Sequence, residues 1–269
     1  MAERIDLFDS TYQHFTERTL DAIRKETFGT DIGQNSWLTV DEYERLLPEL
    51  GLDARSHVLE VASGSGGPAL YVARTYGCRV TGIDANVSGV ATATRAAAAA
   101  GLDAQVRFRE ADATAVLPFP DGAFDALLCI DSMNHFPDRA AVLREWRRVL
   151  RPGGRALFTD PVVITGPITN DELARRSSIG LFVFVPAGLN ERLLAAADLR
   201  LLRQDDVTAN ATLTAGRWLE ARAARRDHLL RIEGEARFAG LQTFFQTVRD
   251  LTAERRLSRI AYVAERPRC

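Results

Sequence analysis

The chain has 269 residues, 46% of them hydrophobic, which is enough for the core of one α/β domain with additions or of two small domains. Its net charge of −2 predicts no broad basic surface for nucleic acid. The three scattered cysteines do not indicate a disulfide framework, and the absence of a His/Cys/Asp cluster at ligand spacing predicts no metal site. The polar first residues and the lack of a long apolar run predict no signal peptide and no membrane-spanning helix, so we expect a cytoplasmic protein.

A first helix is predicted over 8–28, where Phe8, Phe15 and Ile23 belong to one apolar stripe, and a second over 40–47. From residue 57 on, short apolar strands alternate with helices, which is typical of a doubly wound α/β fold with a mostly parallel sheet. The strands are expected at 57–61, 79–83, 105–109, 124–130, 155–160, 199–207 and 259–264. The helices between them are expected at 67–76, 87–100, 138–150 and 187–197.

Residues 211–256 interrupt this alternation, because they show no strand pattern and favour helix with a break at Gly234. We therefore predict a ligand-binding core formed by residues 47–210 and 257–269. The N-terminal helices of 1–46 and the helical insertion 211–256 are predicted to form two parts of one lid over the edge of the sheet.

The most informative stretch is the turn after the first strand. Val58, Leu59 and Val61 indicate a strand that is buried on both faces, and the turn Gly64-Ser65-Gly66-Gly67 follows at once. Pro68 then suits the first turn of a helix. A strand, a glycine turn and a helix start place backbone N–H groups around a nucleotide-like ligand, and glycine permits a close approach.

Two kinds of ligand fit that turn. Gly64-x-Gly66-x-x-Ala69 matches the dinucleotide fingerprint, and Asp84 follows at the expected distance of about 20 residues, which would indicate an NAD-dependent oxidoreductase. Glu60 favours another ligand, because a carboxylate just before the glycines would repel a pyrophosphate. It can instead orient the glycine loop or hold the ammonium end of an amino-acid-like cofactor, and both roles stay open.

The order of motifs resembles that of class I S-adenosylmethionine-dependent methyltransferases. The matching segments are Val58–Gly67, Val80–Asn86, Arg109–Ala113, Phe124–Ile130, Asn134–Asp138 and Val149–Gly154. The resemblance covers about residues 55–161 and implies a Rossmann-like sheet of seven strands, with S-adenosyl-L-methionine as cofactor and S-adenosyl-L-homocysteine as product. Ala62 and Ser63 stand where the family more often has Gly and Cys, and Ala62 restricts φ more than Gly would.

The resemblance also implies which residues hold the cofactor. Asp84 would accept hydrogen bonds from both ribose hydroxyls, and Asp112 with the N–H of Ala113 would contact the adenine. The predicted binding residues in the core are Glu60, Ala62, Ser63, Gly64, Gly66, Asp84, Ala85, Asn86, Asp112, Ala113 and Ile130. In the lid, Gln34 and Trp37 are predicted near the methionine moiety, with Tyr12 closing over the site. A capped start of helix 40–47 and a core aromatic are the structural alternatives for these lid residues.

Acidic residues stand at or just after the ends of several strands, and the carboxyl ends of parallel strands share one edge, so we expect a convergent site. These residues are Glu60, Asp84, Asp112, Asp131 and Asp160. His135 follows the fourth strand, and a neutral imidazole is a suitable base near pH 7. The resemblance implies that His135 and Asp160 form the proton-accepting pair, with Asp160 orienting the ring. Asp131 is the alternative base, and a purely structural His135 is the other alternative.

The second lid segment carries a basic flank that could meet an anionic substrate or form a solvated face, made of Arg217, Arg222, Arg225 and Arg226. The function predicted from the sequence is methyl transfer to a small molecule, as in natural product biosynthesis, with a hydroxyl oxygen as the favoured acceptor. Nitrogen or carbon acceptors, an NAD-dependent oxidoreductase and a non-catalytic cofactor-binding module are the alternatives. The expected partner is a small molecule, without nucleic acid or membrane, and a homodimer is possible.

Overall fold

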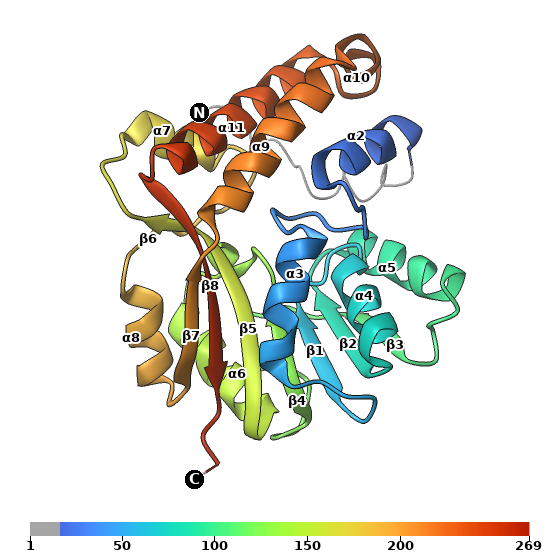
Figure 1. Cartoon of the computed structure of the whole chain (residues 1–269), viewed down its shortest axis with the longest axis vertical. Coiled ribbons are helices and arrows are strands. Elements are labelled where there is room, and N and C mark those ends of the chain that lie inside the picture. The colour runs from blue at the N-terminus through green and yellow to red at the C-terminus, as the bar shows by residue number, and fades with distance from the viewer. Residues whose placement is uncertain (1–16, 269) are drawn as a thin grey trace.

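The computed structural model describes residues 17–268, and its centre is a mixed sheet of eight strands among these residues. Seven strands follow the order β3-β2-β1-β4-β5-β8-β7, and the two-residue β6 pairs with β5 outside this order (Figure 1). Their bounds are β1 His57–Val61, β2 Arg79–Asp84, β3 Val106–Glu110, β4 Phe124–Cys129, β5 Leu150–Ile164, β6 Val185–Pro186, β7 Arg200–Asp206 and β8 Leu257–Glu265. The neighbours from β3 to β5 are parallel, whereas β8 runs antiparallel to both β5 and β7. The predicted doubly wound α/β fold is confirmed, and β6 is the strand that the sequence pattern does not reveal.

Helices cover both faces of the sheet. On one face lie α6 (Arg139–Val149) and α8 (Leu189–Ala196), which bury Leu143, Trp146 and Leu194 against the strands. On the other face lie α3 (Val40–Leu46), the short 3₁₀ helix η1 (Leu47–Leu50), α4 (Gly67–Tyr76) and α5 (Val87–Ala99). Leu59 and Leu127 face the first layer, while their neighbours in the sequence face the second. This burial on both faces explains why the parallel strands appear as short continuous apolar runs.

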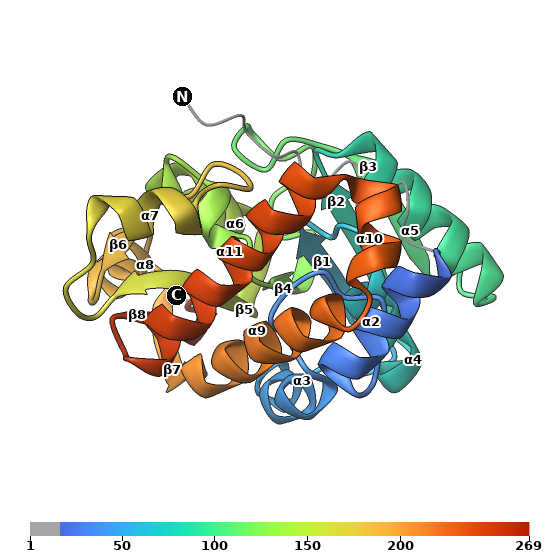
Figure 2. The same ribbon diagram turned by 90° about the horizontal axis from the view of Figure 1, so that it is seen from above.

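The remaining helices gather at one end of the sheet, where the parallel strands have their carboxyl ends. They are α2 (Arg18–Phe28), α7 (Asn170–Arg176), α9 (Thr208–Ala223), α10 (Arg226–Glu233) and α11 (Glu235–Ala253). Figure 2 shows α9 and α11 crossing above the sheet, with α2 beside α9. We call α2, α9, α10 and α11 the covering helices.

The covering helices hold one another through an apolar cluster that Ile23 of α2 shares with Ala221, Leu229 and Phe238. The break between α10 and α11 falls at Gly234, as predicted, because its φ of 77° and ψ of 165° suit glycine alone. The predicted helix 8–28 overlaps α2, while its first half, with Tyr12, lies outside the described residues. No helix among residues 17–268 is long and apolar enough to span a bilayer.

Candidate active site

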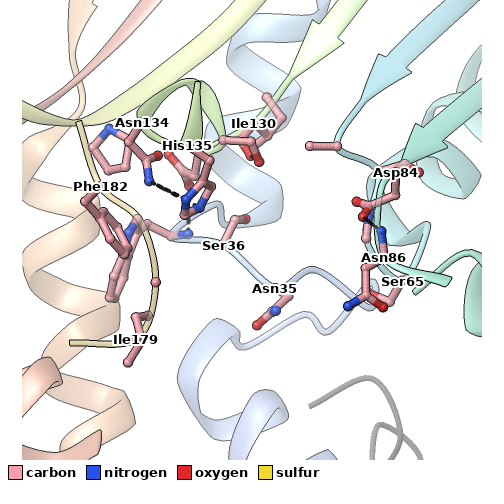
Figure 3. A pocket seen from close by; sticks show the side chains of 18 of the residues that line it. Asn35, Ser36, Ser65, Asp84, Asn86, Ile130, Asn134, His135, Ile179 and Phe182 are labelled. Carbon is pink, nitrogen blue, oxygen red and sulfur yellow. Dashed lines mark hydrogen bonds between the residues drawn. The ribbon is translucent and has the colours of Figure 1, made fainter. Parts of the chain in front are cut away.

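A cavity of about 860 Å³ lies between the carboxyl ends of the parallel strands and the covering helices, within the size range of small-molecule sites. One part of its wall comes from the glycine turn, the end of β2 and the loop after β3. The other part comes from the loop after β4, the segment after α7 and the aromatic side chains of the covering helices. Figure 3 shows Asp84 and Asn86 on one side and Asn134, His135 and Phe182 on the other.

The glycine turn departs from its predicted role at one position. Gly66, with φ 81°, caps α4 and does not line the cavity, because it faces the protein interior. A Cβ there would come within 2.6 Å of Phe108 and 2.7 Å of Ala93. Gly66 is therefore required by packing and backbone conformation and not by ligand approach. Ala62, Ser63, Gly64 and Ser65 do line the cavity, and Ala62 adopts φ 56°, a value that suits glycine better.

Asp84 ends β2 with both carboxylate oxygens engaged by the backbone. Its Oδ2 accepts a hydrogen bond from Gly64 N at 2.7 Å, and its Oδ1 accepts one from Asn86 N at 2.8 Å. Burial raises the pKa of Asp84. Asn86 caps α5 by accepting from Gly89 N at 2.8 Å. Because each carboxylate oxygen has two lone pairs, the fixed Asp84 retains acceptor capacity for two vicinal hydroxyls in the cavity.

Glu60 lies deeper in the wall, inside β1, and is 2% exposed. Burial raises its pKa to about 8, and its Oε2 is buried without a hydrogen-bond partner among the described residues. A buried acceptor without a donor is unfavourable unless a ligand supplies one.

The loop after β3 closes this part of the cavity. Asp112 holds the loop by accepting from the N–H of Thr114 at 2.8 Å and from its hydroxyl at 2.7 Å. Ala113 is buried beside it, and Ala85 and Ile130 complete the wall. This part of the wall thus combines small apolar side chains with one carboxylate, a composition that suits a heterocycle with an amino group.

His135 belongs to the short 3₁₀ helix η2 (Met133–His135) after β4 and lines the opposite part of the same cavity. Its Nδ1 lies 2.8 Å from the carbonyl oxygen of Leu181, which can only accept, so the proton of the neutral ring is on Nδ1. Asn134 Nδ2 lies 3.2 Å from Nε2, and the Phe182 ring packs edge-on at 5.0 Å between ring centroids. Burial lowers the pKa of His135, which keeps the imidazole neutral at pH 7.

Comparison with known proteins identifies the family. A model of the methyltransferase domain matches residues 59–158. The O-methyltransferase resE of Aspergillus sclerotiorum is 31% identical over 226 residues, which cover 79% of this chain and 82% of that protein. The chain belongs to the class I S-adenosylmethionine-dependent methyltransferases.

Other relatives share a shorter part of the chain. The 27-O-demethylrifamycin SV methyltransferase of Amycolatopsis mediterranei is 36% identical over 149 residues, 55% of this chain and 54% of that protein. The chain thus spans about half the length of this curated relative. Further relatives carry the names of N- and C-methyltransferases. The solved phosphoethanolamine N-methyltransferase 2 of Haemonchus contortus, with S-adenosylhomocysteine bound, shows the same fold, with a TM-score of 0.80, 19% identity, and coverage of 96% of this chain and 59% of that one.

Family membership explains the Gly64-x-Gly66 turn, so the match to the dinucleotide fingerprint does not require a bound dinucleotide. The residues that line the cavity fit S-adenosylmethionine. The unpartnered Oε2 of Glu60 suits the ammonium group of the methionine moiety. Asp84 suits the ribose hydroxyls, and the apolar wall of Ala85, Ala113 and Ile130 beside Asp112 suits the adenine. When bound, this cofactor supplies an electrophilic methyl group.

Asp160 does not meet His135, which corrects the predicted proton-accepting pair. Its carboxylate is fully buried, forms an ion pair with Arg139 and accepts from Asn190 Nδ2 at 2.8 Å. It does not line the cavity. The prediction placed Asp160 at the end of a strand, but β5 continues to Ile164, so this residue lies inside the strand. The carbonyl of Leu181 takes the place of the predicted acid beside His135.

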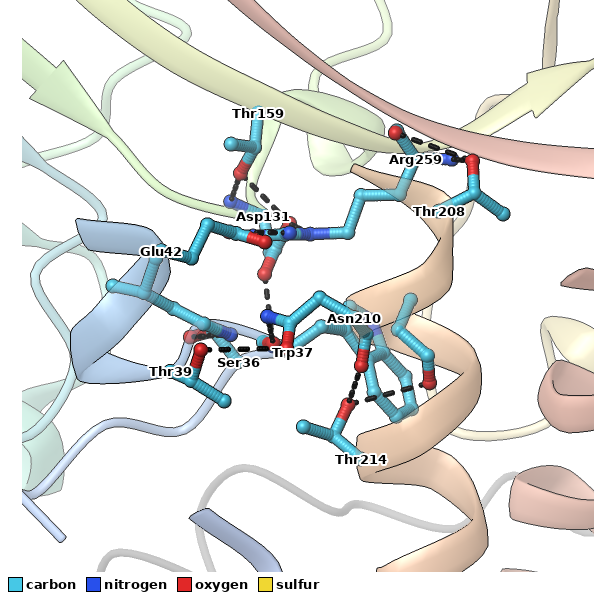
Figure 4. A network of polar contacts seen from close by, with 12 residues as sticks. Ser36, Trp37, Thr39, Glu42, Asp131, Thr159, Thr208, Asn210, Thr214 and Arg259 are labelled. Carbon is cyan, nitrogen blue, oxygen red and sulfur yellow. Dashed lines mark hydrogen bonds and ion pairs between the residues drawn. The ribbon is translucent and has the colours of Figure 1, made fainter. Parts of the chain in front are cut away.

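Asp131 lines the cavity, yet its oxygens are engaged in a buried network (Figure 4). Oδ1 accepts from Thr159 Oγ1 and from Arg259 Nε, each at 2.7 Å, and Oδ2 accepts from Trp37 N at 2.8 Å. Arg259 also pairs with Glu42 at 2.6 Å. Both carboxylate oxygens of Asp131 are thus occupied by donors of the protein itself, so this geometry favours His135 over Asp131 as the proton acceptor.

The same network fixes Trp37 in the cavity wall. The carbonyl of Trp37 accepts from Asn210 Nδ2 of α9 at 2.8 Å, and its ring stacks on Phe244 of α11 with centroids 6.2 Å apart. Gln34 is fully buried and does not line the cavity, contrary to the prediction. Its amide instead closes its own loop, donating to the carbonyl of Leu38 at 3.2 Å and accepting from Ile32 N at 2.9 Å.

The predicted basic flank of α9 and α10 is engaged within the protein. Arg222 pairs with Glu233 at 2.6 Å, Arg225 pairs with Glu26 of α2, and Arg217 donates to the carbonyl of Thr27 at 3.3 Å. These arginines therefore link the covering helices to one another.

The sequence analysis missed much of the wall opposite the glycine turn. The missed residues that line the cavity include Arg176, Ile179, Phe182, Trp218, Leu241, Phe244 and Phe245. They come from α7, α9, α11 and the segment after α7, where spacing predicts only helix or loop. The paired aromatics Phe244-Phe245 are the one visible sign, and on a helix such a pair is equally typical of a core.

Proposed function

We propose that the protein transfers a methyl group from S-adenosylmethionine to a hydroxyl oxygen of a small molecule, with His135 as the proton acceptor. One observation carries the choice of oxygen. His135 lines the same cavity as Glu60, Asp84 and Asp112, the residues that suit the cofactor. It donates its Nδ1 proton to Leu181 O at 2.8 Å, so the ring nitrogen that accepts protons is Nε2. An amine nucleophile works without a base once it is unprotonated, whereas a hydroxyl benefits from one.

The residues around the glycine turn hold and orient the cofactor in this proposal. Glu60 holds the ammonium group, Asp84 holds the ribose hydroxyls, and Asp112 with Ala113 lies against the adenine. Their supports are backbone groups of the core, such as the N–H of Gly64 on Asp84 at 2.7 Å. Rigid placement matters because in-line displacement depends on alignment of the nucleophile with the methyl group.

His135 moves the proton. Nε2 would accept a hydrogen bond from the hydroxyl of the acceptor and take its proton as the oxygen–methyl bond forms, while the sulfur–methyl bond of the bound cofactor breaks and leaves S-adenosylhomocysteine. The bond from Nδ1 to Leu181 keeps the ring in the tautomer that this transfer requires.

The covering helices exclude water from the reacting groups. Trp218 stacks on Phe245 with centroids 5.3 Å apart, and Trp37 packs against Phe244 and Phe245. We propose that residues 1–46 and 211–256 act together as the lid of the site, since α2 and α9 already share an apolar cluster.

Turnover with a panel of small hydroxylated acceptors tests the proposal. S-adenosylhomocysteine release and a mass increase of one methyl group on oxygen are the expected products. His135→Ala should lower the rate by roughly 10²–10⁴-fold at unchanged cofactor affinity, while His57→Gln, at the far end of β1, should leave it unchanged.

The pH profile provides a second readout. The rate should rise with pH and level off, with a midpoint below 6.5 because burial lowers the pKa of His135. A His135→Ala variant that keeps the full rate and this profile would reject His135 as the base. Methylation at nitrogen alone across a matched panel would reject the choice of oxygen.

A further inference from the structure

Arg176 presents a buried cation to the cavity. It is the last residue of α7, is 1% exposed and lines the wall near Phe182. Its Nε and Nη1 are buried without a hydrogen-bond partner among the described residues. A guanidinium keeps its charge at neutral pH, and here burial lowers the pKa only to about 9. The side chain is thus a buried cation in which two donor nitrogens lack acceptors.

Three aromatic rings lie around this guanidinium. Its central carbon lies 4.6 Å from the ring centroid of Phe182, 5.1 Å from that of Phe244 and 6.0 Å from that of Trp37. Such contacts stabilise a cation through its faces but give its in-plane N–H groups no acceptor. The nearest acids do not supply one, because Asp131 is bound to Arg259 and Asp160 to Arg139.

A planar anion is the ligand that completes this arrangement. A carboxylate forms short, strong charge-assisted hydrogen bonds with guanidinium N–H groups, so its oxygens can complete the unpartnered nitrogens of Arg176. Arg176 lines the cavity, so a ligand there can reach this side chain. Asn134 Oδ1, also buried without a partner among the described residues, adds an acceptor in the same wall for a hydroxyl.

Resting on the proposed function, we propose that Arg176 binds a carboxylate of the acceptor molecule. The substrates are then acidic small molecules whose carboxylate pairs with Arg176 between the aromatic rings while their hydroxyl faces His135. Arg176 thus determines substrate specificity, whereas Glu60 and Asp84 bind the cofactor.

Binding to the protein saturated with S-adenosylhomocysteine tests this proposal without turnover. The probes are 4-hydroxybenzoate and its neutral analogue 4-hydroxybenzamide, measured by calorimetry. The wild type should bind the acid at least about tenfold more tightly than the amide, as expected for a charge-assisted pair. Arg176→Met should weaken binding of the acid roughly 10–100-fold and abolish the preference, whereas Arg175→Met, an exposed neighbour on α7, should retain it.

Two further measurements separate the possible causes. Without ligand, Arg176→Met should melt at the wild-type temperature or above, because it removes an unpaired buried charge. Its affinity for S-adenosylhomocysteine should be unchanged, and a loss there would assign Arg176 to the cofactor and overturn the proposal. Equal binding of acid and amide by the wild type would overturn it as well. If the protein binds the acid more tightly than the amide through Arg176 but shows no methyl transfer in the turnover assay, the carboxylate site is upheld and the proposed function is rejected.

Discussion

Replacing Glu60 by Gln should change stability and cofactor binding in opposite directions. Burial raises the pKa of Glu60 from 4.5 to about 8, so the carboxyl of the cofactor-free protein is largely neutral at pH 7. In the unfolded chain it ionises near 4.5. A raised pKa in the folded state contributes stability that is fully present below pH 4.5 and is lost as pH rises through 8.

The size of the effect follows from the pKa difference. One pKa unit corresponds to about 1.4 kcal/mol, so the rise from 4.5 to about 8 sets an upper bound of about 5 kcal/mol at pH 9. Gln has nearly the same shape and stays neutral. Glu60→Gln should therefore unfold like the wild type at pH 4.5 and be more stable at pH 9, measured by urea denaturation. Glu110→Gln, at an exposed position on β3, is the matched control and should show no such dependence.

Cofactor binding should show the opposite sign. If the ammonium group of S-adenosylhomocysteine pairs with ionised Glu60, binding at pH 7 must release about 0.9 proton from a group of pKa about 8. Calorimetry in buffers of different ionisation enthalpy measures this release directly. Wild-type affinity should increase with pH up to about 8, and Glu60→Gln should bind more weakly and release no proton. Equal proton release by both proteins would refute the assignment and leave Glu60 as a support of the glycine loop.

Three further substitutions test other parts of the site. Asp84→Ala should weaken S-adenosylhomocysteine binding by about 2 kcal/mol in calorimetry, because the ribose hydroxyls lose a charged acceptor, and unchanged affinity would contradict this role. Ala62→Gly should stabilise the protein by about 1 kcal/mol in thermal denaturation, since φ is 56°, while Ala98→Gly in helix α5 should destabilise it by a similar amount. Asp160→Ala should cost about 3–5 kcal/mol of stability because it leaves Arg139 buried without its carboxylate, and an unaltered melting curve with a changed pH profile would restore Asp160 to the catalytic site.

The sheet and the cavity wall beside the glycine turn were predictable because local patterns determine them. A parallel strand buried on both faces is a continuous apolar run, and β1, β2 and β4 all show it. Asp84 and Glu60 could be placed because each stands at a fixed position relative to a strand end. The error at Asp160 has the same origin, since the apolar run of β5 extends past the acid and the predicted strand end was too early.

Contacts between distant segments were beyond such patterns. Asp131 accepts from Trp37 N, 94 positions away in the sequence, and nothing near either residue indicates the other. Gln34 stands next to cavity residues but turns into its own loop. Arg176 shares its surroundings with rings from three separate segments, which only the folded chain brings together.

Buried charges divide into two classes that the folded structure separates. Among the described residues, nearly all buried charged side chains have an ion-pair partner: Arg24, Glu42, Asp131, Arg139, Asp160, Arg222 and Arg259. Glu60 and Arg176 have none, and both line the cavity. Because a buried ionisable group without a partner destabilises a fold, the presence of two such groups in one cavity is best explained by ligands that complete each of them. The anion suits the ammonium group of the methyl donor, and the cation suits an acidic methyl acceptor. Under the proposed function, Glu60 and Arg176 thus match the two molecules that methyl transfer brings together.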